Sequence, residues 1–155
     1  MEFQNTIGYG TFNANGGDPS LTDDTWVSFP FAFRSQLEKN TTKPTGATTS
    51  SVQVKATGMY FIEFSFIADG GDSKNYNIRP YVNGAVYTTN GTGMQIRFYQ
   101  QPLTQKYEAS THGLFALTKD DIIEWKIYVT TESSTDFFTR DIVMNIINLQ
   151  QIGLH

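Results

Sequence analysis

The chain has 155 residues, a formal net charge of −4 and an isoelectric point near 5.0, which together predict a single acidic domain. Its Lys and Arg residues form no cluster, so nucleic acid is not an expected partner. Because cysteine is absent, thiol chemistry and cysteine-based zinc sites are excluded. No apolar run reaches the roughly 18 residues of a membrane helix, and the first residues lack the pattern of a signal peptide, so no membrane partner is expected.

Residues 1–24 are expected to form a segment distinct from the rest of the chain. Four apolar residues, Phe3, Ile7, Tyr9 and Phe12, are spaced among Gly and Asn, and the polar run NANGGDPSLTDD follows them. This pattern predicts a short apolar anchor and a flexible connector. An ordered first strand followed by a loop, or a frayed terminus, fits the same residues.

Short strands separated by turn signals are predicted throughout residues 25–155. WVSFPFAF at 26–33 indicates the first strand, in which Pro30 marks an edge or a bulge because it removes a ladder donor. Residues 35–50 are polar and are expected to form a loop. Further strands are predicted at 51–55, 58–68, 76–82, 85–89, 94–100, 107–117, 122–130 and 138–152. About nine strands without helical periodicity indicate an all-β sandwich or barrel.

The strand at 58–68 has the strongest alternation in the chain. Tyr60, Ile62, Phe64 and Phe66 lie on one face, since successive side chains of a strand point to opposite sides. This face is wholly apolar and is expected to build the core. The strand at 76–82 is followed by Asn-Gly, which is the strongest short signal for a hairpin.

Two strands are apolar on both faces. In the final strand Ile142, Met144 and Ile146 share one face, while Val143, Ile147 and Leu149 share the other. The strand at 58–68 likewise carries Met59, Phe61 and Ile67 on its second face. A sandwich strand normally turns a polar face to solvent, so this second face needs a cover. Neighbouring subunits or an arm of the same chain fit that requirement, and we expect neighbouring subunits.

Four stretches resemble the trimeric jelly roll of tumour necrosis factor and of the globular head of complement first-component subunit q. They are TGMYFI at 57–62, YVNG at 81–84, LTKDDII at 117–123 and the closing strand at 142–153. Order and spacing agree over residues 26–153. The chain departs from the family at Asp120, where the family prefers Gly, and so it matches the fold better than any subfamily.

The resemblance implies an all-β, jelly-roll β-sandwich of two antiparallel sheets that assembles as a homotrimer. In this family the Tyr-bearing face of the strand after the Gly points into the sandwich, and the opposite face points towards the threefold axis. Carried over to this chain, Tyr60 is a core residue and Phe61 approaches a neighbouring subunit. The expected oligomer interface contains Met59, Phe61, Glu63, Val143, Ile147 and Leu149.

No catalytic constellation is evident. His112 and His155 are the only histidines, and neither belongs to a Ser-His-Asp order or an HExxH motif, so no catalytic residue is expected. Asp69 and Asp72 have oxygens suited to calcium, but Gly and Asp are also the ordinary residues of turns, and no cofactor or metal is expected. Aromatic residues near loops fit either a glycan or receptor site or the core: Tyr76, Tyr81, Tyr87, Phe98, Tyr99 and Tyr107.

These features together predict a non-enzymatic virion structural protein. Low charge and an Asn- and Thr-rich surface are typical of virion or extracellular proteins. A phage head fibre, a capsid decoration protein or a tail-fibre tip fits, with the N-terminal segment docked to other virion proteins and the trimeric knob projecting towards the host. The alternative is a receptor- or glycan-binding module of a bacterial surface or secreted protein.

Overall fold

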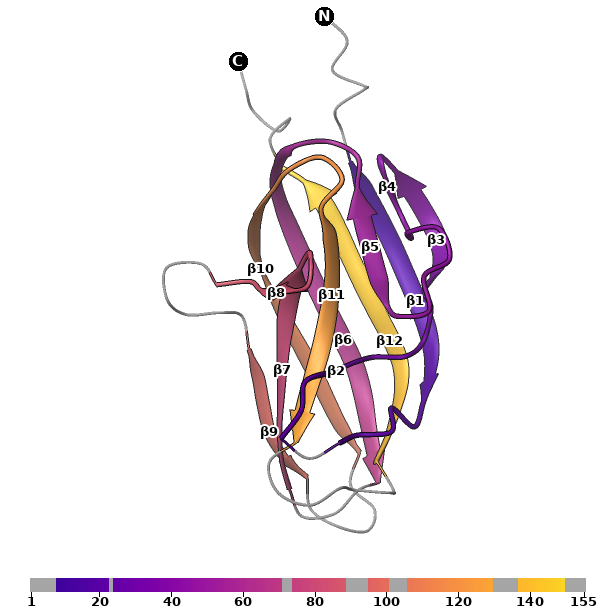
Figure 1. The fold of residues 1–155 in the computed structure, drawn as a ribbon. Helices are drawn as coiled ribbons and strands as arrows, with labels where there is room; N and C mark the ends of the chain where they lie inside the picture. The colour runs from indigo at the N-terminus through magenta and orange to yellow at the C-terminus, as the bar shows by residue number, and fades with distance from the viewer. Residues whose placement is uncertain are drawn as a thin grey trace, which may run out of the picture.

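Two antiparallel β-sheets pack face to face in the structure, a computed structural model that describes residues 8–22, 24–70, 74–88, 95–100, 106–129 and 137–149 (Figure 1). The five-stranded sheet has the order β10-β6-β12-β1-β3. Its strands are β1 (Tyr9–Gly17), β3 (Arg34–Lys39), β6 (Gly58–Gly70), β10 (Tyr107–Leu117) and β12 (Phe137–Asn148). The part of the chain described contains no helix that could span a membrane.

The seven-stranded sheet has the order β4-β5-β11-β7-β8, with β2 also paired to β11 and β9 to β7. Its strands are β2 (Val27–Ser28), β4 (Thr41–Thr42), β5 (Ser51–Val54), β7 (Lys74–Val82), β8 (Ala85–Val86), β9 (Ile96–Gln100) and β11 (Ile122–Val129). Apart from the sequential pairs β4–β5 and β7–β8, most neighbours within the sheets come from distant parts of the sequence, as in a jelly roll. The predicted all-β jelly-roll sandwich is confirmed.

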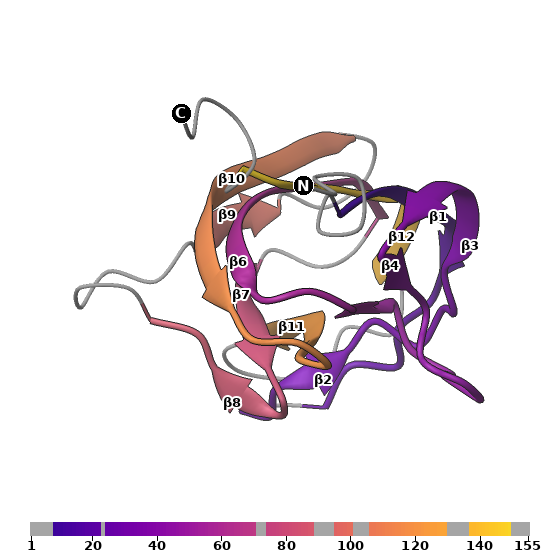
Figure 2. The same ribbon diagram turned by 90° about the horizontal axis from the view of Figure 1, so that it is seen from above.

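The core fills the space between the sheets, and Figure 2 shows the strands arranged around it when the molecule is seen from above. The predicted core face of β6 is confirmed, because Tyr60, Ile62 and Phe64 are fully buried. From the opposite sheet, the indole of Trp125 stacks on the Phe64 ring with centroids 4.6 Å apart. Phe29 packs against Phe64 as well, at 5.6 Å, so aromatic contacts join the two sheets.

The first strand differs most from the expectation. Residues 9–17 form β1, which lies between β12 and β3 inside the five-stranded sheet, so residue 24 does not separate an external segment from the sandwich. Phe12 is fully buried and packs on Phe33 with ring centroids 6.1 Å apart. The prediction that Phe12 attaches the protein to a particle is therefore wrong, because its ring belongs to the core. The alternative of an ordered first strand describes these residues.

The segment from 26 to 50 also differs in detail. Strand β2 ends at Ser28, two residues before Pro30, which has no N–H for a ladder. The predicted inward face of this segment is nevertheless present, since Phe29 and Phe33 are buried. Residues expected to lie in a polar loop form the edge strand β3, in which every residue but Lys39 is exposed. An exposed polar edge strand has no alternation for sequence analysis to detect.

Gly16 of β1 lies close against the backbone of β12, and replacing it with Ala is expected to destabilise the fold. The residue has a φ of +85°, and an added Cβ would lie 2.1 Å from the carbonyl oxygen of Thr139. Because both groups are backbone, neither yields easily, and we expect Gly16→Ala to lower the free energy of unfolding by about 3 kcal/mol or more, the upper end of the cost of local strain. Urea denaturation measures this change.

Gly46→Ala is the matched control for this strain. Gly46 has a similar φ of +71°, but nothing lies within 4 Å of the position of an added Cβ. It is expected to cost only about 1 kcal/mol, from the backbone conformation alone. Equal costs at the two positions would contradict the close contact between β1 and β12.

The first and last described residues lie at the same end of the sandwich. The Asn148 N–H donates to the carbonyl oxygen of Gly8 over 2.6 Å, and the Leu149 N–H donates to the carbonyl oxygen of Met59 over 2.7 Å. β1 therefore starts where β12 ends, at the upper end of the molecule in Figure 1. Gly8 and Leu149, the two ends of the described chain, both lie at this pole.

Candidate functional site

An apolar row crosses four strands on the outer face of the five-stranded sheet. The pairing register places Leu114 of β10, Phe61 of β6, Ile147 of β12 and Tyr9 of β1 side by side. Leu114 is 50% exposed and Ile147 is 38% exposed, although both are large apolar residues. In the next row Met59, which is 41% exposed, lies opposite Ala116. We call these six residues the outer apolar patch.

The alternation of strands explains why the patch lies there. Tyr60 and Ile62 point into the core, so their neighbours in β6 must point outwards. Strands β6 and β12 are both interior strands of the sheet, with a hydrogen-bonded neighbour on each side. Their backbone groups are therefore already paired, and a partner meets only their side chains. Strand addition is therefore excluded over β6 and β12, and β10 is the edge strand on this side of the patch.

A shallow hollow of about 200 Å³ opens within the patch. The residues around it come from three adjacent strands, β1, β6 and β12: Tyr9, Gly10, Thr11, Phe61, Asn145, Ile146 and Ile147. Three residues of the outer apolar patch, Tyr9, Phe61 and Ile147, are among those that line it. It offers a place for a protruding side chain of a partner.

A polar row lies directly beside the apolar one. Glu63 of β6 is flanked by His112 of β10 and Asn145 of β12 in the register. The His112 ring lies 5.7 Å from the Phe61 ring, so the two rows touch. Within the described part of the chain, Glu63 has no ion pair. A partner that covers this face must leave water at Glu63 or supply a hydrogen-bond donor, because an unpaired buried carboxylate is costly.

The six residues predicted for the oligomer interface all lie along this outer face. Met59, Phe61 and Glu63 come from β6 and are joined by three residues from β12 and its end: Val143, Ile147 and Leu149. Sequence analysis missed Leu114 and Ala116, which β10 adds to the same surface. Their position opposite β6 depends on how β10 and β6 pair, and the alternation within one strand does not predict that pairing.

The predicted attachment residues fall into three situations. Phe3 and Ile7 lie outside the described residues. Tyr9 is half-buried and lies opposite Ile147, so it belongs to the outer apolar patch. Phe12, as described above, is in the core.

The other candidate sites find little support in the structure. Asp72 and the Asp69 side chain lie outside the described residues, and no group of three His, Asp or Glu side chains suited to a metal occurs among those described. Of the aromatic residues considered for recognition, Tyr76 and Tyr81 are buried, and Tyr87 stacks on Phe115 at 4.5 Å. Tyr107 is 38% exposed, and the side chains of Phe98 and Tyr99 are not described.

The strand order and the two-sheet packing define a class, the jelly roll of tumour necrosis factor and complement subunit q, and the resemblance seen in the sequence is confirmed as one of fold. Murine APRIL at pH 8.0 is similar, with a TM-score of 0.59 and 13% identity over 93% of this chain and 100% of that one. Eiger TNF from S. frugiperda gives a TM-score of 0.62 and 12% identity over 93% of each chain. The globular domain of zebrafish complement 1qA protein gives 0.52 and 14%, over 90% of this chain and 94% of that one.

No family model matches the chain, and a search of curated proteins finds no match. The similarity is therefore one of architecture, at identities that carry no site residue from one protein to another.

Proposed function

We propose that this protein is a non-enzymatic homotrimer, held together through the outer apolar patch. The observation that carries the proposal is an apolar row across β10, β6, β12 and β1, on the face that the sandwich itself leaves uncovered. Covering these side chains removes apolar surface from water, which is the main driving force of association. Contiguous exposed apolar surface on a soluble domain is typical of a binding site.

Three copies fit better than an open chain of copies. When one surface of a subunit binds a different surface of the next copy, the copies form a ring if the rotation between them closes. They form a fibre if it does not. The resemblance to the trimeric jelly rolls implies closure at three. The mass in solution, measured by light scattering after size exclusion, is then three times 17.4 kDa. A stable monomer at micromolar concentration would contradict the proposal.

We further propose that the trimer is a virion structural protein, a phage head fibre, capsid decoration or tail-fibre tip. Low charge, at 17% of residues, and the apolar residues that precede the first strand support this role. Phe12 is a core residue and Tyr9 belongs to the outer apolar patch. The residues proposed to attach the protein to the particle are therefore Phe3 and Ile7. Deletion of residues 1–24, the natural first experiment, would remove β1 and unfold the sheet.

The sharper test of attachment is the double variant Phe3→Ala, Ile7→Ala. We expect its incorporation into virus particles to fall by about tenfold or more, since two large apolar anchors lose several kcal/mol of burial. Quantitative mass spectrometry of purified particles measures the ratio to the major capsid protein. The trimer mass of the variant must be unchanged, because neither residue belongs to the outer apolar patch. Unchanged incorporation would contradict attachment through this segment.

The alternative, a receptor- or glycan-binding module, is favoured by a separate observation on the opposite sheet. There a group of arginines and aromatic residues lies on the outer face of the sheet.

A further inference from the structure

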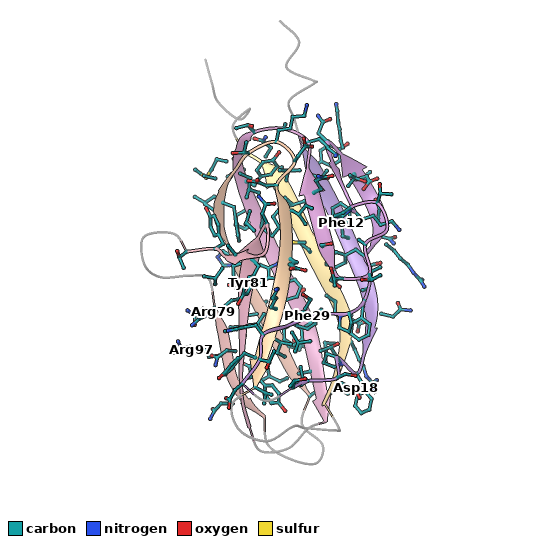
Figure 3. All side chains as sticks on the ribbon, viewed as in Figure 1. Phe12, Asp18, Phe29, Arg79, Tyr81 and Arg97 are labelled. Atoms are coloured by element: carbon teal, nitrogen blue, oxygen red, sulfur yellow. The ribbon has the colours of Figure 1, made fainter. Side chains whose placement is uncertain are left out.

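Two arginines lie next to each other on the outer face of the seven-stranded sheet. In the register of β7 with β9, Arg97 lies opposite Asn77, and Arg79 is the next residue of β7 on the same face. Figure 3 labels both, on the side of the molecule where β7 and β9 run. Arg97 is exposed and Arg79 is half-buried. We call Arg79, Arg97, Asn77, Gln95 and Trp26 the arginine patch.

The two guanidinium groups share one neutral acceptor. Arg79 donates through Nη2 to Oε1 of Gln95 over 3.3 Å, and Arg97 donates through Nε to the same oxygen over 3.1 Å. The Nε of Arg79 is buried and has no hydrogen-bond partner among the described residues. The ion pairs within the described ranges are Lys55–Asp120 and Lys126–Glu124, so neither arginine has a carboxylate. Two like charges are thus held together without a counter-charge.

Two acidic residues beside β7, Glu124 and Asp24, already have other partners. Glu124 pairs with Lys126 at 3.7 Å and accepts a hydrogen bond from Ser28 at 3.2 Å. Asp24 accepts a hydrogen bond from the Tyr128 hydroxyl at 2.8 Å. That hydrogen bond, with burial and the charge of Asp24, raises the pKa of Tyr128, so its hydroxyl stays a neutral donor at pH 7. The arginines are therefore left to an anion from outside.

Aromatic and amide side chains surround the arginines. The Arg79 guanidinium carbon lies 5.0 Å from the centroid of the Trp26 ring, which holds it in place. Trp26 in turn packs on Tyr128 of β11, with ring centroids 5.1 Å apart. Tyr128 lies opposite Asn77 of β7 in the register. A hollow of about 220 Å³ opens beside Arg97, lined by Asn75, Tyr76, Asn77 and Arg97.

We propose that the arginine patch binds a carboxylate-bearing saccharide. The planar fork of a guanidinium matches a carboxylate with two parallel hydrogen bonds, and a pair of them fixes one charged group firmly. The amides of Asn75 and Asn77 offer both donors and acceptors, which suits sugar hydroxyls. Trp26 packs on Tyr128 and lies under the Arg79 guanidinium, so these rings fix the position of the arginine. β7 is paired on both sides here, so a ligand lying over β7 meets side chains and not free backbone groups. The proposal is independent of the trimer, because it uses the other sheet.

Titration of the intact protein with two acidic probes, trigalacturonate and sialyllactose, tests the site by calorimetry and by NMR shifts of the arginine side chains. We expect at least one probe to bind at millimolar concentration or below, and its methyl ester to bind about tenfold or more weakly. Arg97→Gln is expected to lose a similar factor, and Arg97→Lys to lose part of it, because Lys keeps the charge without the fork.

Lys55→Gln is the matched control, since it removes one exposed cation from a different part of the surface. It is expected to bind as the unchanged protein does. The proposal is overturned if neither acidic probe binds, if acid and ester bind equally, or if Lys55→Gln weakens binding as much as Arg97→Gln. Tighter binding of a glutamate-rich peptide than of both saccharides would overturn the assignment to a sugar. These results do not depend on the oligomeric state, so a protein that proves to be a monomer would be expected to give the same binding.

Discussion

Replacing Phe61 with Asp is expected to convert the trimer into a folded monomer. Phe61 lies in the middle of the outer apolar patch, between Leu114 and Ile147 in the register. In the assembly the substitution places one new carboxylate per subunit on a covered surface, next to Glu63. Central apolar anchors of interfaces typically contribute about 2 kcal/mol or more each, and an unpaired buried charge adds to the loss.

The measured mass should fall from three times to once 17.4 kDa, with far-ultraviolet circular dichroism unchanged. The fold survives because Phe61 points away from the core that Tyr60 and Ile62 build. Val86→Asp is the matched control, since Val86 is 40% exposed but lies on β8 in the other sheet. A trimeric Phe61→Asp variant, or equal dissociation of both variants, would refute the interface. Leu114→Asp, at a 50% exposed position, repeats the test should Phe61→Asp fail to fold.

Trp125→Ala is expected to cost about 3–5 kcal/mol of stability, a large share of the roughly 5–15 kcal/mol of a typical domain. Trp125 is fully buried at the centre of the seven-stranded sheet. Its ring stacks on Phe64 with an interplanar angle of 7° and meets Phe115 edge-on at 6.4 Å. The substitution leaves a cavity between the sheets that rigid strands cannot close. Urea unfolding followed by circular dichroism, in the monomeric Phe61→Asp background, separates this loss from dissociation.

Trp125→Phe is the informative companion variant. The indole Nε1 is buried and has no hydrogen-bond partner within the described ranges, and an unsatisfied buried donor costs about 1–3 kcal/mol. Phe keeps a ring to stack on Phe64 and removes this donor, so it should cost less than half as much as Ala. If Phe and Ala cost the same, the donor has a partner and the stack contributes little.

Alternation predicted the strands whose buried face consists of large apolar residues. It failed for β1, whose buried face is Gly10, Phe12 and Ala14, and for β3, which has no buried face. Strands β6, β10 and β11 were located within two residues, since each alternates strongly between buried and exposed side chains. Residues 9–17 are predicted to span the end of an anchor and the start of a connector, because Gly and Asn have low strand propensity, and an ordered first strand is the alternative. These residues form a strand because β12 and β3 lie on either side and pair with their backbone. Pairing with strands that are distant in the sequence cannot be read from residues 9–17 alone.

The sequence predicts which residues of a single strand face outwards at the candidate interface. It does not predict how far that interface extends across neighbouring strands. The outward positions of Phe61 and Ile147 follow from the alternation of side chains along a strand, because their neighbours Tyr60 and Ile146 point into the core. The neighbours of Phe61 across the sheet depend on which strands pair and in which register, so Leu114 and Tyr9 were missed as parts of one surface. The arginine patch was missed for the same reason, since Arg79 and Arg97 come from strands separated by residues 83–95.

The hydrogen bond between Asn148 and Gly8 would give the proposed trimer a direction. Whatever precedes Gly8 and follows Leu149 departs from one pole, so a tether there leaves the other pole free. That distal pole is where β6 ends at Gly70 and where β10 begins at Tyr107. Three parallel copies around one axis would present three such distal surfaces together, each facing away from the point of attachment. A label or a second domain fused at either end of the chain would then mark the proximal side alone.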